Sequence, residues 1–315
     1  MGLGKKLIDK VYRFGDVGYA IYKVALWADV FRNNYGSDRA VCLRKYKRSH
    51  GESFDIDNPQ TLNQKIFWLK LHDRRPIHKI LADKYTVRGY MAEHFGSDKL
   101  IPLLYKTTDW RDITLDVIPD EPCIIKPTHS SGEYEIIRDK SQVDIDKLRF
   151  ECRCWLGRNY YMRSQEWQYK DTTRRLIIEK LLLDKNGHIP NDYKLHYING
   201  KLEFVYCSVS RETVNKRNIY DANWNPLYFT WVEGKKDPAT KRGVEIPAPE
   251  SFEDMKRIGA EIAKNFDYVR VDFYDVDGKL YYGEVTFYHG GGNDIFTPKE
   301  YDLIYGEKLK LTKRV

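Results

Sequence analysis

The chain has 315 residues, of which 42% are hydrophobic and 14% aromatic, and this is enough to bury a large core. We therefore predict a folded globular protein with two domains or subdomains. The formal net charge of +7 favours anionic partners such as nucleotides, acidic glycans or a membrane surface, and it is too small to indicate a nucleic-acid-binding protein. The 24 tyrosines suit a surface that contacts sugar rings.

The cysteines indicate the compartment. Their number is odd, no Cys-x-x-Cys pair occurs, and no secretion signal precedes them. We therefore expect reduced thiols and a cytoplasmic protein. The eight histidines lack the spacing of zinc ligands, so no zinc site is expected. The five cysteines are Cys42, Cys123, Cys152, Cys154 and Cys207.

The first 75 residues predict a helical region. Residues 5–34 carry apolar side chains at mixed helical spacing with basic residues between them, which predicts one or two amphipathic helices. These helices either dock on the protein body, which we favour, or lie on the inner surface of a membrane. Residues 39–50 are rich in Lys and Arg, which we interpret as the solvated face of another helix rather than a binding patch. Nothing in the sequence predicts an oligomeric state.

The middle of the chain alternates helices and strands. Thr61 and Gln64 form a capping box for a helix to about residue 72, and Pro76 starts a helix that Gly96 ends. Strands are predicted at 123–127, 134–137 and 175–183, and a helix at 144–156. Asn199-Gly200 joins a hairpin over 192–207. A loop-rich region at 208–250, a helix from Ser251 to about 266 and a last helix after Pro298 complete the chain.

Residues 268–292 predict a hairpin with two facing carboxylates. Two strand-like runs flank a turn that ends in Gly278, and the alternation of a strand puts Arg270 and Asp272 on one face. Glu284 and Thr286 share a face of the second run for the same reason. Two carboxylates on paired strands repel unless a cation lies between them, and oxygen ligands suit Mg²⁺. The alternative is a surface hairpin with scattered charges.

Two further units predict a nucleotide site. Lys126 ends a short strand, and the Ser130-Ser131-Gly132 loop that follows it can direct backbone N–H groups at phosphate oxygens. This is not a Walker A loop, and the dinucleotide-binding Gly-x-Gly-x-x-Gly pattern is absent. Glu179 and Lys180 lie inside an apolar strand, where a charge needs a partner such as a nucleobase edge. The alternatives are an ordinary hairpin and a strand that leaves the core.

Taken in chain order, these units resemble the ATP-grasp superfamily of carboxylate–amine ligases. The order and spacing resemble D-alanine–D-alanine ligases, and several further segments resemble the TupA-like branch, named after teichuronopeptide biosynthesis and found in bacterial surface-polysaccharide clusters. The resemblance covers roughly residues 55–310. The matching motifs are Leu81 to Arg88 with Asp83-Lys84, Lys126-Pro127, Trp167 to Lys170, Glu179 to Leu182, Asp192 to Lys194, Lys216 to Asp221, Arg270-Val271-Asp272 and Glu284-Val285-Thr286.

The resemblance implies an α+β ATP-grasp fold in which two α+β subdomains grip ATP. We place the N-terminal helical region at residues 1–75, the small lid subdomain at 76–183 and the large subdomain with the metal site at 184–315. Lys84 and Lys126 would bind the α- and β-phosphates, and Glu179 would accept the adenine amino group. The remaining implied ATP contacts are the lid residues Ser130, Ser131 and Gly132, the backbone of Lys180 and Leu182, and Asp184 at the ribose.

The resemblance also implies the catalytic groups. Lys194 would approach the γ-phosphate, and Arg270, together with Lys126, would stabilise the transferring phosphoryl group. Asp272 and Glu284 would hold two Mg²⁺ ions. Thr286 stands where the family has Asn, so this metal ligand is weaker and one ion would rely on water there.

Substrate choice cannot be transferred from the better-known ligases, because Tyr288 to Gly292 replaces the usual Asn-Pro-Gly ending. We take Arg217, His289 and Gly290 as candidate substrate residues, together with the aromatic clusters at 155–169 and 224–231; the alternative is that these aromatic residues pack in the core or lid.

The predicted function is ATP-dependent amide-bond formation through an acyl phosphate, joining an amine such as an amino acid to a uronic acid carboxylate in surface-polysaccharide synthesis. Three alternatives stay open. One is a kinase of the same fold that phosphorylates a sugar or polyol. Another is a nucleotide-sugar glycosyltransferase whose metal motif would be Asp275-Val276-Asp277. The third is a glycan-binding protein without catalysis.

Overall fold

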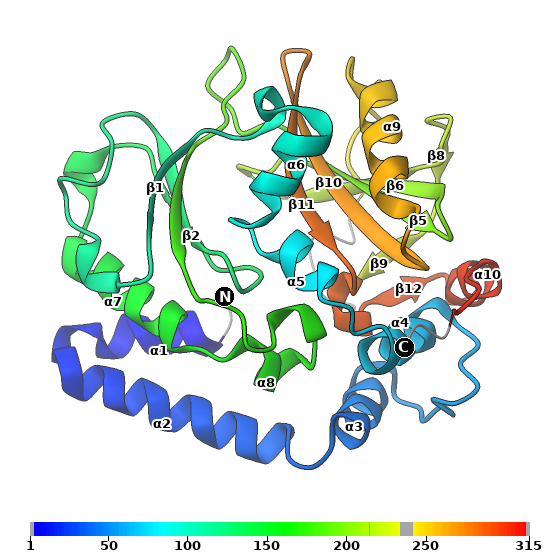
Figure 1. The fold of residues 1–315 in the computed structure, drawn as a ribbon, viewed down its shortest axis with the longest axis horizontal. Coiled ribbons are helices and arrows are strands. Elements are labelled where there is room, and N and C mark those ends of the chain that lie inside the picture. The colour runs from blue at the N-terminus through cyan, green and yellow to red at the C-terminus, as the bar shows by residue number, and fades with distance from the viewer. Residues whose placement is uncertain (1–2, 214, 234–241, 313–315) are drawn as a thin grey trace.

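The computed structural model describes residues 3–213, 215–233 and 242–312, and its strands form two main sheets (Figure 1). A four-stranded antiparallel sheet lies on one side and a six-stranded antiparallel sheet on the other, each with its own hydrophobic core. Helices accompany both sheets, so the predicted α+β class is confirmed.

The smaller sheet has the order β1-β4-β2-β3. Its strands are β1 (Leu103–Thr107), β4 (Leu176–Lys180), β2 (Cys123–Pro127) and β3 (Glu135–Ile137). Helix α7 (Ile145–Gly157), which the Asp144 side chain caps, packs Leu148 and Cys152 into the same core as Ile125 and Ile178. The β2–β3 pair therefore carries the predicted Lys126 unit as a hairpin at the sheet edge.

The larger sheet has the order β11-β10-β5-β6-β7-β8 and contains the predicted hairpin at one edge. Helix α9 (Phe252–Ala263) packs Met255, Ile258 and Ile262 into its core. The strands are β11 (Lys279–Thr286), β10 (Tyr268–Val276), β5 (Asp192–Ile198), β6 (Lys201–Val209), β7 (Lys216–Tyr220) and β8 (Pro226–Leu227).

The remaining helices surround these sheets, and α2 and α3 run along the lower edge of the molecule in Figure 1. No helix among the described residues is long and apolar enough to cross a bilayer. The other elements are α1 (Leu3–Val11), α2 (Gly15–Asn33), α3 (Asp38–His50), α4 (Leu62–His72), α5 (Ile77–Ala82), α6 (Val87–Phe95), α8 (Tyr160–Ser164), α10 (Glu300–Lys308), β9 (Thr230–Val232), β12 (Ile295–Thr297) and short 3-10 turns, of which η7 (His289–Gly292) follows β11.

Three local predictions have definite outcomes. The capping box of Thr61 and Gln64 is present at the start of α4. The single helix predicted from Pro76 to Gly96 is wrong, because the Asp83 carboxylate accepts hydrogen bonds from the N–H groups of Tyr85 and Thr86 and breaks it into α5 and α6. Residues 208–250, predicted as loop, include β7, β8 and β9.

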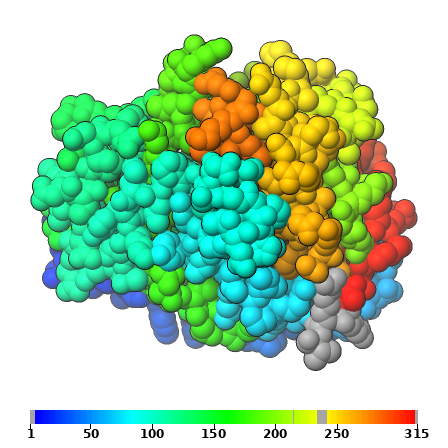
Figure 2. All heavy atoms as spheres, turned by 45° about the horizontal axis from the view of Figure 1, so that its top comes forward, coloured from blue at the N-terminus to red at the C-terminus, as the bar shows by residue number. Residues whose placement is uncertain are grey.

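The packing bears on the predicted boundary at residue 76. Leu81, Val87 and Met91 of α5 and α6 lie in the core of the six-stranded sheet rather than in that of the smaller sheet. Figure 2 shows α5 and α6, in cyan, between the four-stranded part and the β10–β11 hairpin with α9. The division into residues 1–75, 76–183 and 184–315 stays a prediction, and we infer that the smaller subdomain begins after residue 96.

Candidate active site

The hairpin β10–β11 brings the predicted carboxylates face to face. Asp277 and Gly278 form the turn with φ of 52° and 84°, a left-handed pair that suits a two-residue hairpin. In the resulting register Asp272 lies opposite Glu284. On the other side of β10, Asp272 lies opposite Lys194 of β5. One row across the sheet therefore reads Lys194, Asp272, Glu284.

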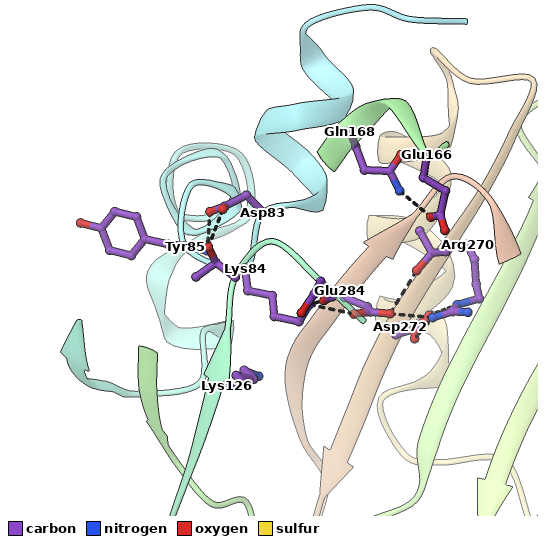
Figure 3. Close-up of polar contacts among 12 residues, drawn as sticks. Asp83, Lys84, Tyr85, Lys126, Glu166, Gln168, Arg270, Asp272 and Glu284 are labelled. Atoms are coloured by element: carbon purple, nitrogen blue, oxygen red, sulfur yellow. Dashed lines mark hydrogen bonds and ion pairs between the residues drawn. The ribbon is translucent and has the colours of Figure 1, made fainter. Parts of the chain in front are cut away.

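Arg270 joins the two carboxylates. Its Nε and Nη2 atoms donate to Asp272 at 2.6 Å each, and Nη2 also donates to Glu284 Oε1 at 2.7 Å (Figure 3). Lys194 Nζ lies 2.9 Å from Asp272 Oδ2. The Thr286 hydroxyl donates to Glu284 Oε1 at 3.1 Å. The four predicted residues of the hairpin and Lys194 thus form one charged network.

Burial and charge act in opposite directions on this network. Burial raises the pKa of the Asp272 carboxyl, and Arg270 and Lys194 oppose that rise without cancelling it. Burial also acts to raise the pKa of Glu284, but Lys84, Arg270 and Lys194 outweigh it and lower that pKa to about 2. Glu284 is therefore an ionised carboxylate surrounded by three cations.

Lys84 connects the hairpin to the loop after β2. Its half-buried ammonium donates to the carbonyl of Ser130 at 2.7 Å. It also lies 3.8 Å from Glu284 Oε2, and Figure 3 shows the Lys84 side chain reaching toward Glu284. Asp83 fixes this position, because its carboxylate accepts from the N–H groups of Tyr85 and Thr86 in the turn before α6 and from the Thr128 hydroxyl at 2.6 Å. The predicted phosphate loop and the predicted metal carboxylate therefore meet at Lys84.

Lys126 and Glu179 lie next to each other on β2 and β4. The Lys126 ammonium is 2.6 Å from Glu179 Oε2, and Arg88 of α6 is 3.1 Å from Glu179 Oε1. Both oxygens of the buried Glu179 therefore have cationic partners. Arg88 had no predicted role, although it ends one of the segments that carry the family resemblance. The adenine contact of Glu179 stays a prediction.

The other predicted ATP residues lie at the surface or in turns. Ser130 is buried, whereas Ser131 and Gly132 are exposed in the loop between β2 and β3. Lys180 is exposed and pairs with Glu121 at 2.7 Å, which leaves its backbone for the predicted role. The Asp184 carboxylate accepts from the N–H groups of Asn186 and His188, so it stabilises a turn, and its ribose contact stays a prediction. Leu182, in the segment after β4, is half-buried.

The candidate substrate residues have mixed positions. His289 is buried, and its Nδ1 accepts from Arg270 Nη1 at 2.8 Å, so the ring holds the arginine in place. Arg217 packs over the Tyr206 ring, 5.0 Å from its centroid. It is not among the described residues that line the cleft next to the Arg270 network. Gly290 lines that cleft with φ of 54°, and a Cβ there would lie 2.4 Å from the Asp294 side chain. Trp231 belongs to the core and the half-buried Trp224 packs against it, in line with the packing alternative, whereas Tyr228 is exposed.

A cleft of about 750 Å³ opens beside the network. Arg270, Glu284 and Thr286 form part of its floor, and Ser131 of the phosphate loop reaches its rim. Helices α2 and α3, which lie outside the predicted ATP-binding pieces, supply another wall. Two predicted aromatic residues, Tyr160 and Tyr169, line the cleft. Many other lining residues had no predicted role, and they include Asp29, Asn33, Asn34, Lys45, Arg48, Ser49, Arg163, Glu166 and Glu233.

The donor set of the hairpin fits Mg²⁺. Asp272 and Glu284 offer carboxylate oxygens from opposed positions, and Thr286 offers a hydroxyl oxygen. The described residues contain no group of three or more His, Cys, Asp or Glu side chains suited to a metal. One or two carboxylates completed by water and phosphate oxygens is how proteins usually hold Mg²⁺.

A family model described as TupA-like ATPgrasp matches residues 64–310. The chain belongs to the TupA-like ATP-grasp family. This confirms the predicted family and the ATP-grasp fold. The family region covers most of α4 and all elements from α5 to α10, whereas α1, α2 and α3 precede it. No curated protein matches the chain.

Solved structures of ATP-grasp ligases are similar at low identity. D-alanine–D-alanine ligase of Bacillus anthracis, complexed with ATP, is 15% identical, with a TM-score of 0.36 over 66% of this chain and 54% of that one. ATP-grasp ligase PsnB, with a minimal precursor, Mg and ADP, is 12% identical, with a TM-score of 0.36 over 68% and 52%. D-alanine–D-alanine ligase of Helicobacter pylori is 13% identical, with a TM-score of 0.38 over 75% and 60%. The chain thus spans little more than half the length of these structures.

Proposed function

We propose that the chain is an ATP-dependent carboxylate–amine ligase. The observation that supports this proposal is the row of Lys194, Asp272 and Glu284 with Arg270 across it and Lys84 beside Glu284. Of these residues, Arg270 and Glu284 line the cleft. The three cations Lys84, Lys194 and Arg270 supply positive charge that would balance a transferring phosphoryl group, and the carboxylates of Asp272 and Glu284 would hold Mg²⁺. Membership in the TupA-like ATP-grasp family supports the same activity.

The reaction would proceed in two balanced steps. An oxygen of the substrate carboxylate attacks the γ-phosphorus of ATP, the bond from that phosphorus to the β–γ bridging oxygen breaks, and ADP leaves. The amine nitrogen then attacks the carbonyl carbon of the acyl phosphate, the carbon–oxygen bond breaks, and the nitrogen loses a proton. The products are an amide, ADP and phosphate. No side-chain nucleophile is needed, because the phosphoryl group activates the carboxyl carbon.

Each residue of the network has a task in this scheme. Arg270, oriented by His289, would balance charge on the phosphoryl oxygens, and Lys84, Lys126 and Lys194 would hold the phosphates. Asp272, Glu284 and Thr286 would hold two Mg²⁺ ions, which supply charge neutralisation for the polyphosphate when bound. The exposed loop of Ser131 and Gly132 would cover the phosphates and exclude water.

The cleft is the proposed site of the carboxylate and amine. Lys45, Arg48 and Arg163 offer cations for a carboxylate, while Asp29, Glu166 and Glu233 offer anions for an ammonium group. Tyr160 and Tyr169 present aromatic surface of the kind that packs on sugar rings. We propose a uronic acid as the carboxylate and an amino acid or similar amine as its partner, in the synthesis of a bacterial surface polysaccharide.

The structure disfavours one alternative function. Asp275 accepts from the Ser251 hydroxyl at 2.6 Å and from the Gly278 N–H at 2.9 Å, and Asp277 accepts from the Lys185 N–H at 2.8 Å. These hydrogen bonds hold the hairpin turn, so the Asp275-Val276-Asp277 segment has a structural role. Neither carboxylate is among the described residues that line the cleft beside the Arg270 network.

A release assay for ADP tests the proposal. The protein is supplied with ATP, Mg²⁺, one uronic acid (glucuronic or galacturonic acid) and one amino acid at a time. We expect ADP release that requires both the acid and the amine and that produces one amide per ADP. ADP release that requires a hydroxyl compound instead, with a phosphate ester as product, would identify a kinase and contradict the proposal.

A further inference from the structure

Helix α2 is apolar on both of its faces. One face packs on α7 and α1, with Tyr22 and Leu26 in a small cluster with Phe150 and Cys154. The Tyr22 hydroxyl accepts from Arg158 at 2.7 Å, and Lys23 donates to the carbonyl of Gly157 at 3.1 Å. This face confirms the predicted docking of the N-terminal helices. A helix that is hydrophobic all round is normally buried on all sides.

The opposite face of α2 is open. Seven of the fifteen exposed large hydrophobic side chains in the described part of the chain lie between residues 14 and 35. Five of them lie in α2, where their spacing of three or four residues places them on one side of the helix, and Phe14 and Tyr35 flank its two ends. The small residues Ala20 and Ala28 between them are exposed as well. The stripe consists of Phe14, Val17, Ile21, Val24, Trp27, Phe31 and Tyr35, with Trp27 68% and Phe31 66% exposed.

The charges around this stripe are predominantly basic. Each acidic residue of α1 and α2 has a partner: Asp9 pairs with Lys147 at 2.8 Å, Asp16 with Arg153 at 2.6 Å and Asp29 with Arg32 at 3.8 Å. Among the described residues, the exposed side chains of Lys6, Lys10 and Arg13 make no ion pair with a carboxylate. On the exposed side of α3, Arg39 pairs with Asp57. Within the described part of the chain, no ion pair is seen for Lys47 or Arg48 of the same helix. The edge formed by α1, α2 and α3 therefore carries uncompensated positive charge.

We propose that the α2 stripe docks on the surface of an anionic lipid bilayer. An apolar face with Trp, Phe and Val, flanked by Lys and Arg, is the composition that lies at the boundary of headgroups and acyl chains. A second copy of the chain would bring two basic edges together, whereas anionic headgroups complement them. The helix lies along the edge of the molecule, so the whole stripe can meet a flat surface at once (Figure 1).

This docking places the cleft beside the membrane. Asp29, Asn33 and Asn34 at the end of α2 line the cleft, while Trp27 and Phe31 from the same turns face outward. A substrate that is carried on a membrane lipid would then reach the cleft without leaving the bilayer surface. The docking itself does not depend on the reaction proposed above.

Vesicle sedimentation tests the proposal with the full chain. We expect it to pellet with vesicles of phosphatidylcholine and phosphatidylglycerol, and less with phosphatidylcholine alone. The double variant Trp27→Ser/Phe31→Ser should bind the anionic vesicles at least ~10-fold more weakly, because two large apolar side chains are lost from the contact. The matched control is Leu303→Ser/Ile304→Ser on α10, which also removes two exposed apolar side chains and should bind like the unmodified chain.

Several results would overturn the docking proposal. These are no sedimentation of the unmodified chain, equal sedimentation with both vesicle types, or equal loss of binding in both double variants. Light scattering tests the alternative that a second copy of the chain covers the stripe. That alternative would be correct if the unmodified chain forms a stable dimer and binds no vesicles, and if Trp27→Ser/Phe31→Ser is a monomer. Retained helical content of each variant by circular dichroism makes these outcomes comparable.

Discussion

At the scale of single residues, the account depends on Asp272. Its carboxylate contacts both Arg270 and Lys194 and faces Glu284 across the hairpin. We predict that Asp272→Asn lowers kcat for ADP release by ~10³-fold or more, because the amide is a poor Mg²⁺ ligand and cannot fix Arg270. A steady-state ADP assay measures this.

Asp277→Asn is the matched control for that variant. It makes the same change five residues further along the hairpin, in the turn, where the carboxylate accepts only from the Lys185 N–H among the contacts described here. Its turnover should stay within about twofold of the unmodified protein. An Asp272→Asn protein that is folded and turns over normally would show that the metal assignment is wrong.

Lys45 gives a second prediction at this scale. The pKa of its ammonium is lowered to about 7, chiefly by burial and then by repulsion from the nearby Lys70. Arg163 also lowers this pKa, whereas Cys42 and Glu166 raise it. The group is therefore charged below pH 7 and neutral above it. We expect KM for the carboxylate substrate to rise as pH increases from 6 to 8, while KM for ATP changes less.

The variant Lys45→Arg tests whether the titration of Lys45, rather than that of another group, causes the rise in KM. Arginine keeps its charge through this range, so the rise in KM should disappear. Lys45→Gln should show a high KM at both pH values. A pH dependence that is identical in all three proteins would remove Lys45 from substrate binding.

The residues of the hairpin could be predicted, and those of the cleft wall could not. Strand alternation and a short turn are local properties, and they are sufficient to bring Arg270, Asp272 and Glu284 together. Lys45 and Arg48 occur in a basic helix whose sequence is typical of a solvated surface. Only the packing of α3 beside the loop that follows α8 makes that surface one wall of a cleft, and such packing leaves no local pattern.

At the scale of elements, the contact of α7 with the N-terminal helices creates a pH dependence of stability. Glu151 of α7 is buried, and burial, followed by repulsion from Glu135, raises the pKa of its carboxyl from 4.5 to about 7. Lys5 and Lys147 oppose this shift, and Asp9 adds to it. Between pH 4.5 and about pH 7 the Glu151 carboxyl loses its proton in the unfolded chain but keeps it in the folded chain. The free energy of unfolding therefore falls as pH rises through this range.

Glu151→Gln should remove this contribution. We expect the variant to be more stable than the unmodified protein at pH 8 by about 1–3 kcal/mol, and to differ little at pH 4. Urea unfolding at both pH values measures the difference. A variant that is less stable at pH 8 would contradict the assignment of a buried, unfavourable charge.

Element boundaries were predictable where the signal is local. The Asn199-Gly200 turn, the capping box of α4 and the start of α7 at the Asp144 cap follow from residues that stabilise a turn or a helix end directly. The break between α5 and α6 was missed although its hydrogen bonds from the Tyr85 and Thr86 N–H groups to Asp83 are local, because the contact that holds the Asp83 carboxylate in place comes from Thr128, 45 residues further along the chain. Strand β7 was missed for a related reason: its pairing with β6 over Lys216 to Tyr220 decides its structure.

At the scale of the whole molecule, the account requires ATP to bind between the two sheets. Lys126 and Glu179 belong to the smaller sheet, whereas Glu284 belongs to the larger one, and Lys84 reaches between them. A ligand that binds only the folded state raises stability by about 2.7 kcal/mol at 100 times its Kd. We predict that ATP with Mg²⁺ raises the Tm and that UDP-sugars do not.

Lys126→Met tests whether the smaller sheet contributes to ATP binding. The variant should lose most of the ATP-dependent rise in Tm, because one phosphate contact is gone. Lys180→Met, on the neighbouring strand but exposed, should keep it. Equal protection of all three proteins by ATP would indicate a nucleotide site elsewhere.

Trapping with hydroxylamine tests the central claim most directly. The protein is incubated with ATP, Mg²⁺ and the uronic acid that supports ADP release, with hydroxylamine in place of the amine. Ligation through an acyl phosphate predicts one hydroxamate per ADP, and neither product from Asp272→Asn. ADP with a stable phosphate ester and no hydroxamate would contradict the account, because the phosphoryl group would then have been transferred to a hydroxyl rather than to a carboxylate.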